Sequence, residues 1–141
     1  HYRDRRQRQM CIRDSFINES EASLLSGKKT IYDSASLFLD LGLKIVVVKK
    51  GGQGAELFSN EKNIKIGAYK VNVVDPTGAG DVFGGAFIST LAQGGTLSDS
   101  LVNGSAMASF CVEGFGTSCL LNVSGEELED RKSKLYSTLS S

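Results

Sequence analysis

The 141-residue sequence has little of several features that mark particular protein classes. Its 16 lysines and arginines are balanced by 16 aspartates and glutamates, so the basic excess typical of a nucleic-acid-binding protein is missing. No apolar run approaches the roughly 20 residues that a helix needs to span a bilayer. The length suits one domain or a piece of one. We therefore expect a globular chain with neither nucleic acid nor a membrane as partner.

Histidine and cysteine are also scarce. The one histidine, His1, lies in an arginine-rich segment, so we expect neither a histidine-based mechanism nor a histidine-rich metal site. The three cysteines, Cys11, Cys111 and Cys119, have no CxxC spacing. This pattern favours a reduced, cytoplasmic protein over a disulfide-bonded scaffold or a zinc site.

Residues 1–15 (HYRDRRQRQMCIRDS) differ from the rest because they hold five arginines and no apolar stripe. They could form a basic arm that binds RNA or an acidic partner. The interpretation that we favour is a foreign or disordered leader, because such a composition cannot offset the entropy of an ordered chain. We set this segment aside and treat residues 16–141 as one region.

The sequence of residues 16–141 predicts both helices and strands along the chain, which is typical of a layered α/β domain. The predicted helices cover residues 18–26, 34–41, 79–93, 97–112 and 124–139. The predicted strands cover residues 44–49, 55–59, 63–69 and 71–74.

Residues 73–87 (VVDPTGAGDVFGGAF) carry most of the chemical information. A strand leads into a turn with Gly78 and Gly80, and a helix begins there. Backbone N–H groups converge at such a turn, and together with the helix dipole they favour an anion. The segment lacks the GxxxxGK[ST] pattern, and Gly84 falls one residue late for the dinucleotide fingerprint. A phosphate site of another kind is therefore expected.

Asp81 distinguishes this turn, because a carboxylate beside a resting phosphate would repel it. Its position makes chemical sense if it takes a proton from a hydroxyl group that attacks the phosphoryl group. The structural alternative is that aspartate favours the first turn of any helix and glycine favours any turn.

The same segment closely resembles the C-terminal signature of the ribokinase-like (PfkB) carbohydrate kinases, D-[TP]-T-G-A-G-D-x-F. Two weaker matches lie earlier in the chain, in the family's order. Residues 18–21 (NESE) resemble its N-x-x-E motif, and residues 49–54 (KKGGQG) resemble its [TK]-x-G-x-x-G loop. The resemblance covers residues 16 to 139 and implies the C-terminal, nucleotide-binding portion of a ribokinase-like layered α/β/α fold.

This resemblance implies roles for the residues around the turn. Asp81 takes the place of the catalytic base, and Gly78, Ala79 and Gly80 take the place of the anion hole that holds the transferred phosphoryl group. Asp75 lies where several members, but not all, place a loop for a monovalent cation such as K⁺. The implied cofactors are thus ATP and Mg²⁺, with K⁺ in those members.

The nucleotide contacts implied by the resemblance are Lys49, Gly51 and Gly54 in the loop, and Asn103 on the adenine side. Ser105 is the alternative to Asn103 at that position. The loop glycines could equally form a plain hairpin turn, and Lys49 could be a solvated charge at the end of a strand.

Asn18 and Glu21 belong to the motif that the family links to Mg²⁺ and phosphate. Their spacing also fits a capping box, in which Asn18 is the N-cap and Glu21 reaches back to it. Taken without the other motifs, the capping box is the better interpretation.

Members of the family are considerably longer, so the resemblance implies a C-terminal fragment without the lid and the acceptor-binding residues. We expect the parent enzyme to transfer the γ-phosphate of ATP to a hydroxymethyl group of a sugar or nucleoside. Family dimers often use the lid, so the resemblance allows a homodimer of the full-length parent and leaves its oligomeric state open. The fragment alone should be inactive, and residues 45–48 should form a strand with one open side. Two other classes stay open: a non-catalytic nucleotide- or phosphate-binding module, and an interaction protein that uses residues 1–15.

Overall fold

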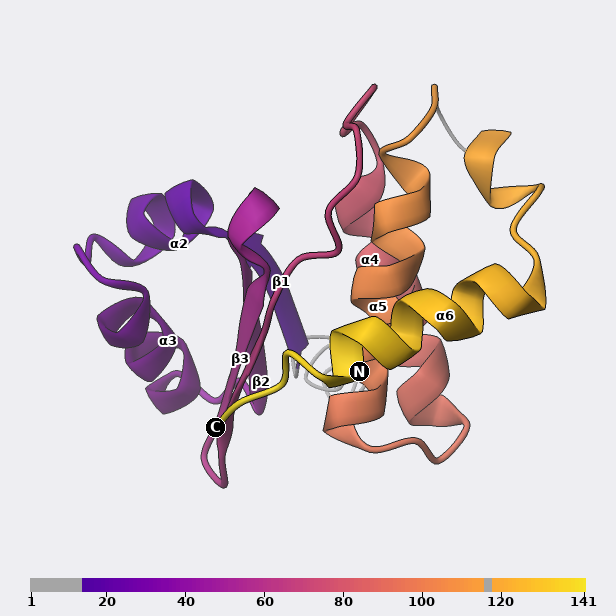
Figure 1. Cartoon of the computed structure of the whole chain (residues 1–141). Coiled ribbons are helices and arrows are strands. Elements are labelled where there is room, and N and C mark those ends of the chain that lie inside the picture. The colour runs from indigo at the N-terminus through magenta and orange to yellow at the C-terminus, as the bar shows by residue number, and fades with distance from the viewer. Residues whose placement is uncertain (1–13, 116–117) are drawn as a thin grey trace, which may run out of the picture. The chain divides into compact units, whose positions relative to one another are not determined.

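The computed structural model describes residues 14–115 and 118–141, and the chain divides into two compact units (Figure 1). The first unit runs to Lys50 and also includes residues 56–63, whereas the second comprises residues 51–55 and 64–141. The expectations for His1 and Cys11 lie outside the described residues. The predicted mixture of helices and a sheet is confirmed.

The sheet has four strands in the order β1 (Asp14–Asn18), β2 (Ile45–Lys49), β3 (Ala55–Ser59) and β4 (Asn63–Ile66). β1 and β2 run parallel, and Asn18 lies opposite Lys49. Because β2 lies between β1 and β3, the expectation of an open side at β2 is wrong. The neighbour is β1, a strand that was not predicted from the sequence and that begins inside the segment set aside.

In the first unit, α2 (Glu19–Ser26) and α3 (Ile31–Asp40) cover one face of the strands (Figure 1). Side chains from both helices and three strands form its core: Ile17, Ala22, Ala35, Val46, Val48 and Phe58. The small residues Ala22 and Ala35 are each 1% exposed, which allows the helix backbones to lie close to the sheet. The apolar pattern of the strands therefore fixes where both helices pack.

The second unit is built on α4 (Ala79–Ala92), α5 (Leu97–Cys111) and α6 (Gly125–Tyr136), with short 3₁₀ turns at η1 (Gly51–Gln53) and η2 (Ser118–Leu120). α4 and α5 pack against each other along their lengths. A Cβ atom on Gly104 would lie 3.0 Å from the carbonyl oxygen of Phe83, so this glycine permits the close approach of the two helices. Phe83 and Phe87 stack beside it in the buried core.

Residues 71–74 do not form the predicted strand. The N–H groups of Val74 and Asp75 both donate to the carbonyl oxygen of Val112, at 2.7 and 3.2 Å. The end of α5 thus takes the hydrogen bonds that a sheet neighbour would have taken. Val73 is 62% exposed, which is another departure from a buried strand.

Arg131 attaches α6 to α5. Its guanidinium carbon lies 3.6 Å from the ring centroid of Phe110 and 4.7 Å from that of Tyr69. The same group donates to the hydroxyl oxygen of Ser109 at 2.9 Å and pairs with the carboxylate of Glu113. The guanidinium thus contacts two rings with its faces and two polar groups with its edges, and it holds α6 against α5.

A hydrogen bond also joins α6 to α5 at the C-terminal end of α6. The hydroxyl of Tyr136 donates to Oδ1 of Asp99 at 2.5 Å. Burial and then this hydrogen bond raise the pKa of Tyr136 to about 12, and the same bond is the main reason that the pKa of Asp99 is lowered.

We expect this pair to make the stability of the chain fall at alkaline pH. Because the folded chain holds the Tyr136 proton more tightly than the unfolded chain does, the contribution is full below the ordinary pKa of about 10. It is lost as the pH rises from there to about 12. Solvent screening of this partly exposed pair limits the loss to about 1 kcal/mol. Urea unfolding of the chain and of Tyr136→Phe from pH 8 to pH 11.5 tests this, and curves that stay parallel over that range would contradict it.

Candidate functional site

The start of α4 differs from the start of every other α-helix in the described part of the chain. The side chains of Asn18, Thr30, Thr96 and Ser124 cap α2, α3, α5 and α6 by accepting a backbone hydrogen bond. The N-cap of α4 is Gly78, which has a φ of 81° and makes no side-chain cap hydrogen bond in the described part of the chain. A left-handed glycine at this place turns the chain sharply into the helix.

The backbone amides that follow Gly78 differ in whether a hydrogen bond already occupies them. Ala79 donates its N–H to the carbonyl oxygen of Pro76 at 3.2 Å, whereas no side chain caps the N–H groups of Gly80 and Asp81. Unsatisfied N–H groups at the positive end of a 14-residue helix attract an anion. The exposed Asp81 carboxylate stands on the same helical turn as these N–H groups.

The loop that leads into this turn is held from two sides. Oδ1 of Asp75 accepts the N–H of Thr77 at 3.0 Å. The thiol of Cys111, which is 1% exposed, donates to the carbonyl oxygen of Thr77 at 3.8 Å. These two hydrogen bonds hold the loop from Asp75 to Thr77 in place just before α4.

The glycine loop between β2 and β3 contains two left-handed residues, Gly51 with a φ of 55° and Gly54 with a φ of 94°. The N–H of Gly54 donates to the carbonyl oxygen of Gly51 at 3.1 Å and closes the turn. A Cβ atom on Gly54 would lie 2.0 Å from the carbonyl oxygen of Ile66. Packing therefore requires glycine at 54, whatever its role toward a nucleotide.

Asn18, Glu21 and Lys49 come together in the first unit at the carboxyl ends of the parallel strands β1 and β2. Ligands of α/β proteins commonly bind at such an edge. Asn18 and Glu21 form the capping box: Glu21 N–H donates to Asn18 Oδ1 at 2.8 Å, and Asn18 N–H donates to Glu21 Oε2 at 2.9 Å. Glu21 stays exposed, and Mg²⁺ is commonly bound by one or two carboxylates together with substrate phosphates, so its carboxylate fits such an ion.

Asn103 lies on α5 and makes a contact that was not predicted from the sequence. Its Nδ2 donates to Oγ1 of Thr90 on α4 at 2.8 Å, and that hydroxyl donates to the carbonyl oxygen of Ala86 at 2.8 Å. The amide therefore links the two helices, and its predicted role toward adenine stays a prediction.

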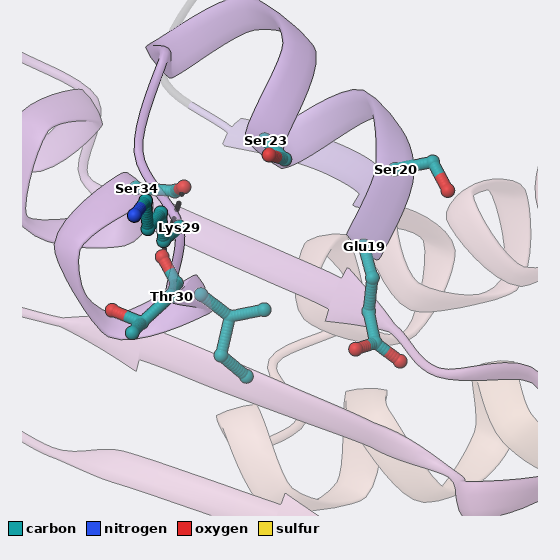
Figure 2. Close-up of a pocket in the computed structure, with 7 residues that line it drawn as sticks. Glu19, Ser20, Ser23, Lys29, Thr30 and Ser34 are labelled. Atoms are coloured by element: carbon teal, nitrogen blue, oxygen red, sulfur yellow. Dashed lines mark hydrogen bonds between the residues drawn. The ribbon is translucent and has the colours of Figure 1, made fainter.

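A polar pocket of about 260 Å³ lies between α2 and the start of α3 (Figure 2). Figure 2 shows Glu19 and Ser20 on one side, and Lys29, Thr30 and Ser34 on the other. The hydroxyls of Ser23 and Ser34 already donate to backbone carbonyls. The pocket residues in the described part of the chain include none of the predicted site residues, and we assign it no role.

An ion pair at the base of the glycine loop was not predicted from the sequence. Nζ of Lys50 lies 2.9 Å from Oε2 of Glu56, whose side chain is fully buried on β3. The available signal was a glutamate inside an otherwise apolar strand, AELFS, because a buried carboxylate requires a nearby cation.

The described residues hold no cluster of three His, Cys, Asp or Glu side chains arranged to bind a metal, and they contain no helix that is long and apolar enough to cross a membrane.

Comparison with known proteins agrees with this architecture. Residues 10–122 match the family model described as pfkB family carbohydrate kinase. The chain is 40% identical over 105 residues to a ribokinase of Staphylococcus aureus (strain COL), which covers 70% of this chain and 34% of that protein. The chain thus spans about a third of the length of this curated relative.

Two solved structures share the fold. A structure of a proposed ribokinase II from E. coli with ATP and Mg²⁺ superposes with a TM-score of 0.76 and 32% identity, over 92% of this chain and 43% of that one. An Arabidopsis thaliana ribokinase with ribose and ATP gives a TM-score of 0.73 and 30% identity, over 88% and 43%. The signature at the start of α4 and the family match to residues 10–122 lead to one conclusion: this chain belongs to the pfkB family of carbohydrate kinases.

Proposed function

We propose that this chain is the nucleotide-binding portion of an enzyme that transfers the γ-phosphate of ATP to a hydroxymethyl group of a sugar or nucleoside. The observation that carries the proposal is the start of α4, where amides without a side-chain cap adjoin the exposed carboxylate of Asp81. The similar Arabidopsis thaliana structure with ribose and ATP supports this class of substrates.

Asp81 acts as the general base that accepts the proton of the acceptor hydroxyl. Gly78, Ala79 and Gly80 form the anion hole, in which backbone N–H groups stabilise the charge on the transferred group. The N–H of Gly80 is already oriented by the helix, so little reorganisation is needed there when charge develops. The N–H of Ala79 donates to the carbonyl oxygen of Pro76 and would turn from it toward the transferred group.

The remaining predicted residues bind the nucleotide and ions. Lys49, Gly51 and Gly54 present the loop toward ATP, and Asn103 lies on the adenine side. Asn18 and Glu21 would hold Mg²⁺, which when bound neutralises charge on the phosphate oxygens. Oδ1 of Asp75 is oriented by the N–H of Thr77, and this carboxylate would serve a monovalent cation such as K⁺.

A hybrid kinase tests the proposal. It joins the N-terminal part of the S. aureus ribokinase, up to the matched region, to this chain from Asp14 onward. We expect the hybrid kinase to consume ATP in the presence of ribose, because the added part supplies the missing acceptor-binding residues. The chain alone should show no turnover, and the relative's own full-length ribokinase is the positive control.

Two results would contradict the proposal. A folded hybrid kinase that binds ATP without phosphorylating ribose, deoxyribose, fructose or nucleosides would favour a non-catalytic nucleotide-binding module. Turnover by the chain alone at the usual kinase rates of about 1–100 s⁻¹ would show that it needs no other part.

A further inference from the structure

Glu56 is a charged residue in an unusual environment. It lies on β3 with its side chain at 0% exposure, and its neighbours in the strand, Ala55 and Leu57, are also buried. Removal of a carboxylate from water is costly unless a cation lies beside it. Lys50, whose side chain is 21% exposed, supplies that cation at 2.9 Å.

The two residues of the ion pair flank the glycine loop, with Lys50 before it and Glu56 after it. Lys50 follows the last residue of β2, and Glu56 is the second residue of β3. The five residues between them contain η1 and Gly54. The Lys50–Glu56 bond therefore joins the two ends of the loop, in addition to the Gly54–Gly51 hydrogen bond inside it.

Stability alone does not account for such a pair, because an apolar pair of similar volume is often as stabilising or more so. An ion pair constrains the positions of its two side chains more closely than an apolar pair does, because the ammonium group must lie within hydrogen-bond distance of a carboxylate oxygen. Because the ammonium group of Lys50 is bound to Glu56, the adjacent Lys49 is the lysine that we expect to contact a ligand.

We propose that Lys50 and Glu56 are a positioning pair that fixes the glycine loop of residues 51–54 in its nucleotide-binding conformation before the nucleotide arrives. The part of this inference that concerns the nucleotide rests on the proposed function. A loop that is ordered in advance binds with a smaller loss of entropy, so the pair acts on nucleotide affinity through the loop backbone.

The first test is hydrogen exchange in the chain itself. In the double variant Lys50→Leu/Glu56→Leu, we expect the Gly54 amide to exchange about tenfold faster while the amide of Leu57 in β3 and the urea midpoint stay unchanged. The single variant Lys50→Arg keeps the cation beside Glu56, so its Gly54 amide should exchange as slowly as in the unmodified chain. If the double variant fails to fold, Glu56→Gln replaces it. This substitution removes the charge of Glu56 but keeps one acceptor oxygen, and we again expect faster exchange of the Gly54 amide.

The matched control is the exposed pair Lys134–Asp130, which has the same 2.9 Å separation. Lys134→Gln/Asp130→Asn should leave Gly54 exchange unchanged. An unchanged Gly54 rate in Lys50→Leu/Glu56→Leu, or equal acceleration of the Gly54 and Leu57 amides in that variant, would overturn the inference.

The second test is kinetic and uses the hybrid kinase. The Lys50→Leu/Glu56→Leu variant should raise KM for ATP about tenfold with little change in kcat or in KM for ribose, because uniform nucleotide binding is lost. Equal increases in both KM values would indicate a general structural effect and overturn the inference. Failure of the unmodified hybrid kinase to use ATP would count against the proposed function instead, and the exchange result would still decide whether the pair holds the loop.

Discussion

Substitution of Asp81 by Asn is expected to lower kcat of the hybrid kinase by about 10²–10⁴-fold, the usual contribution of a general base. The amide of Asn has nearly the same shape as the carboxylate but cannot accept the hydroxyl proton. KM for ATP should change little, because the N–H groups of the proposed anion hole at Gly78, Ala79 and Gly80 come from the backbone. Steady-state kinetics with ribose and ATP measure both quantities.

Asp33→Asn is the matched control for this variant. Asp33 occupies the same third position of α3 that Asp81 occupies in α4, and its backbone N–H donates to the Thr30 side chain at 3.1 Å. Both substitutions remove one negative charge from a helix N-terminus, worth about 0.3–1 kcal/mol of stability. An equal fall in kcat for Asp81→Asn and Asp33→Asn would contradict the prediction that Asp81 is the general base.

Substitution of Gly54 by Ala is expected to destabilise the chain by more than about 3 kcal/mol, because its Cβ would lie 2.0 Å from a backbone oxygen in a left-handed conformation. The carbonyl of Ile66 belongs to β4 and cannot move without breaking the strand. Urea unfolding followed by circular dichroism measures the loss, and an unfolded variant satisfies the prediction as well.

Two other glycines of the same loop separate the effect of the steric clash from the effect of the left-handed backbone. Gly51 has a φ of 55° and open space within 4 Å of the position that a Cβ atom would take, so Gly51→Ala should cost about 1 kcal/mol from backbone strain alone. Gly52 has neither obstacle, so Gly52→Ala should stay within about 0.5 kcal/mol of the unmodified chain. A loss for Gly54→Ala no larger than that for Gly51→Ala would show that Ile66 gives way easily.

The sequence predicted the elements that have strong local signals. The predicted helix at 79–93 differs from α4 by one residue at its end, and the apolar run at 45–48 lies inside β2. Both depend on short-range patterns of apolar residues, glycines and caps.

The misses depend on contacts between distant residues. β1 has few apolar residues, so its strand conformation depends on pairing with β2, which comes much later in the sequence. Residues 71–74 have a strand-like composition, but Val112 takes their hydrogen bonds. The same holds at the glycine loop, because the reason for glycine at 54 lies at Ile66. Local patterns carry no information about such partners.

β4 is joined to a much later part of the chain, with a consequence for how this protein is made in the cell. The N–H of Gly67 donates to Oγ1 of Thr138, 71 residues further on, and Lys65 and Ser140 exchange two backbone hydrogen bonds. Such distant contacts require costly loop closure and slow a folding reaction. During translation, these bonds have no partner until Thr138 and Ser140 have left the ribosome, so the second unit completes its structure only after most of it has been synthesised.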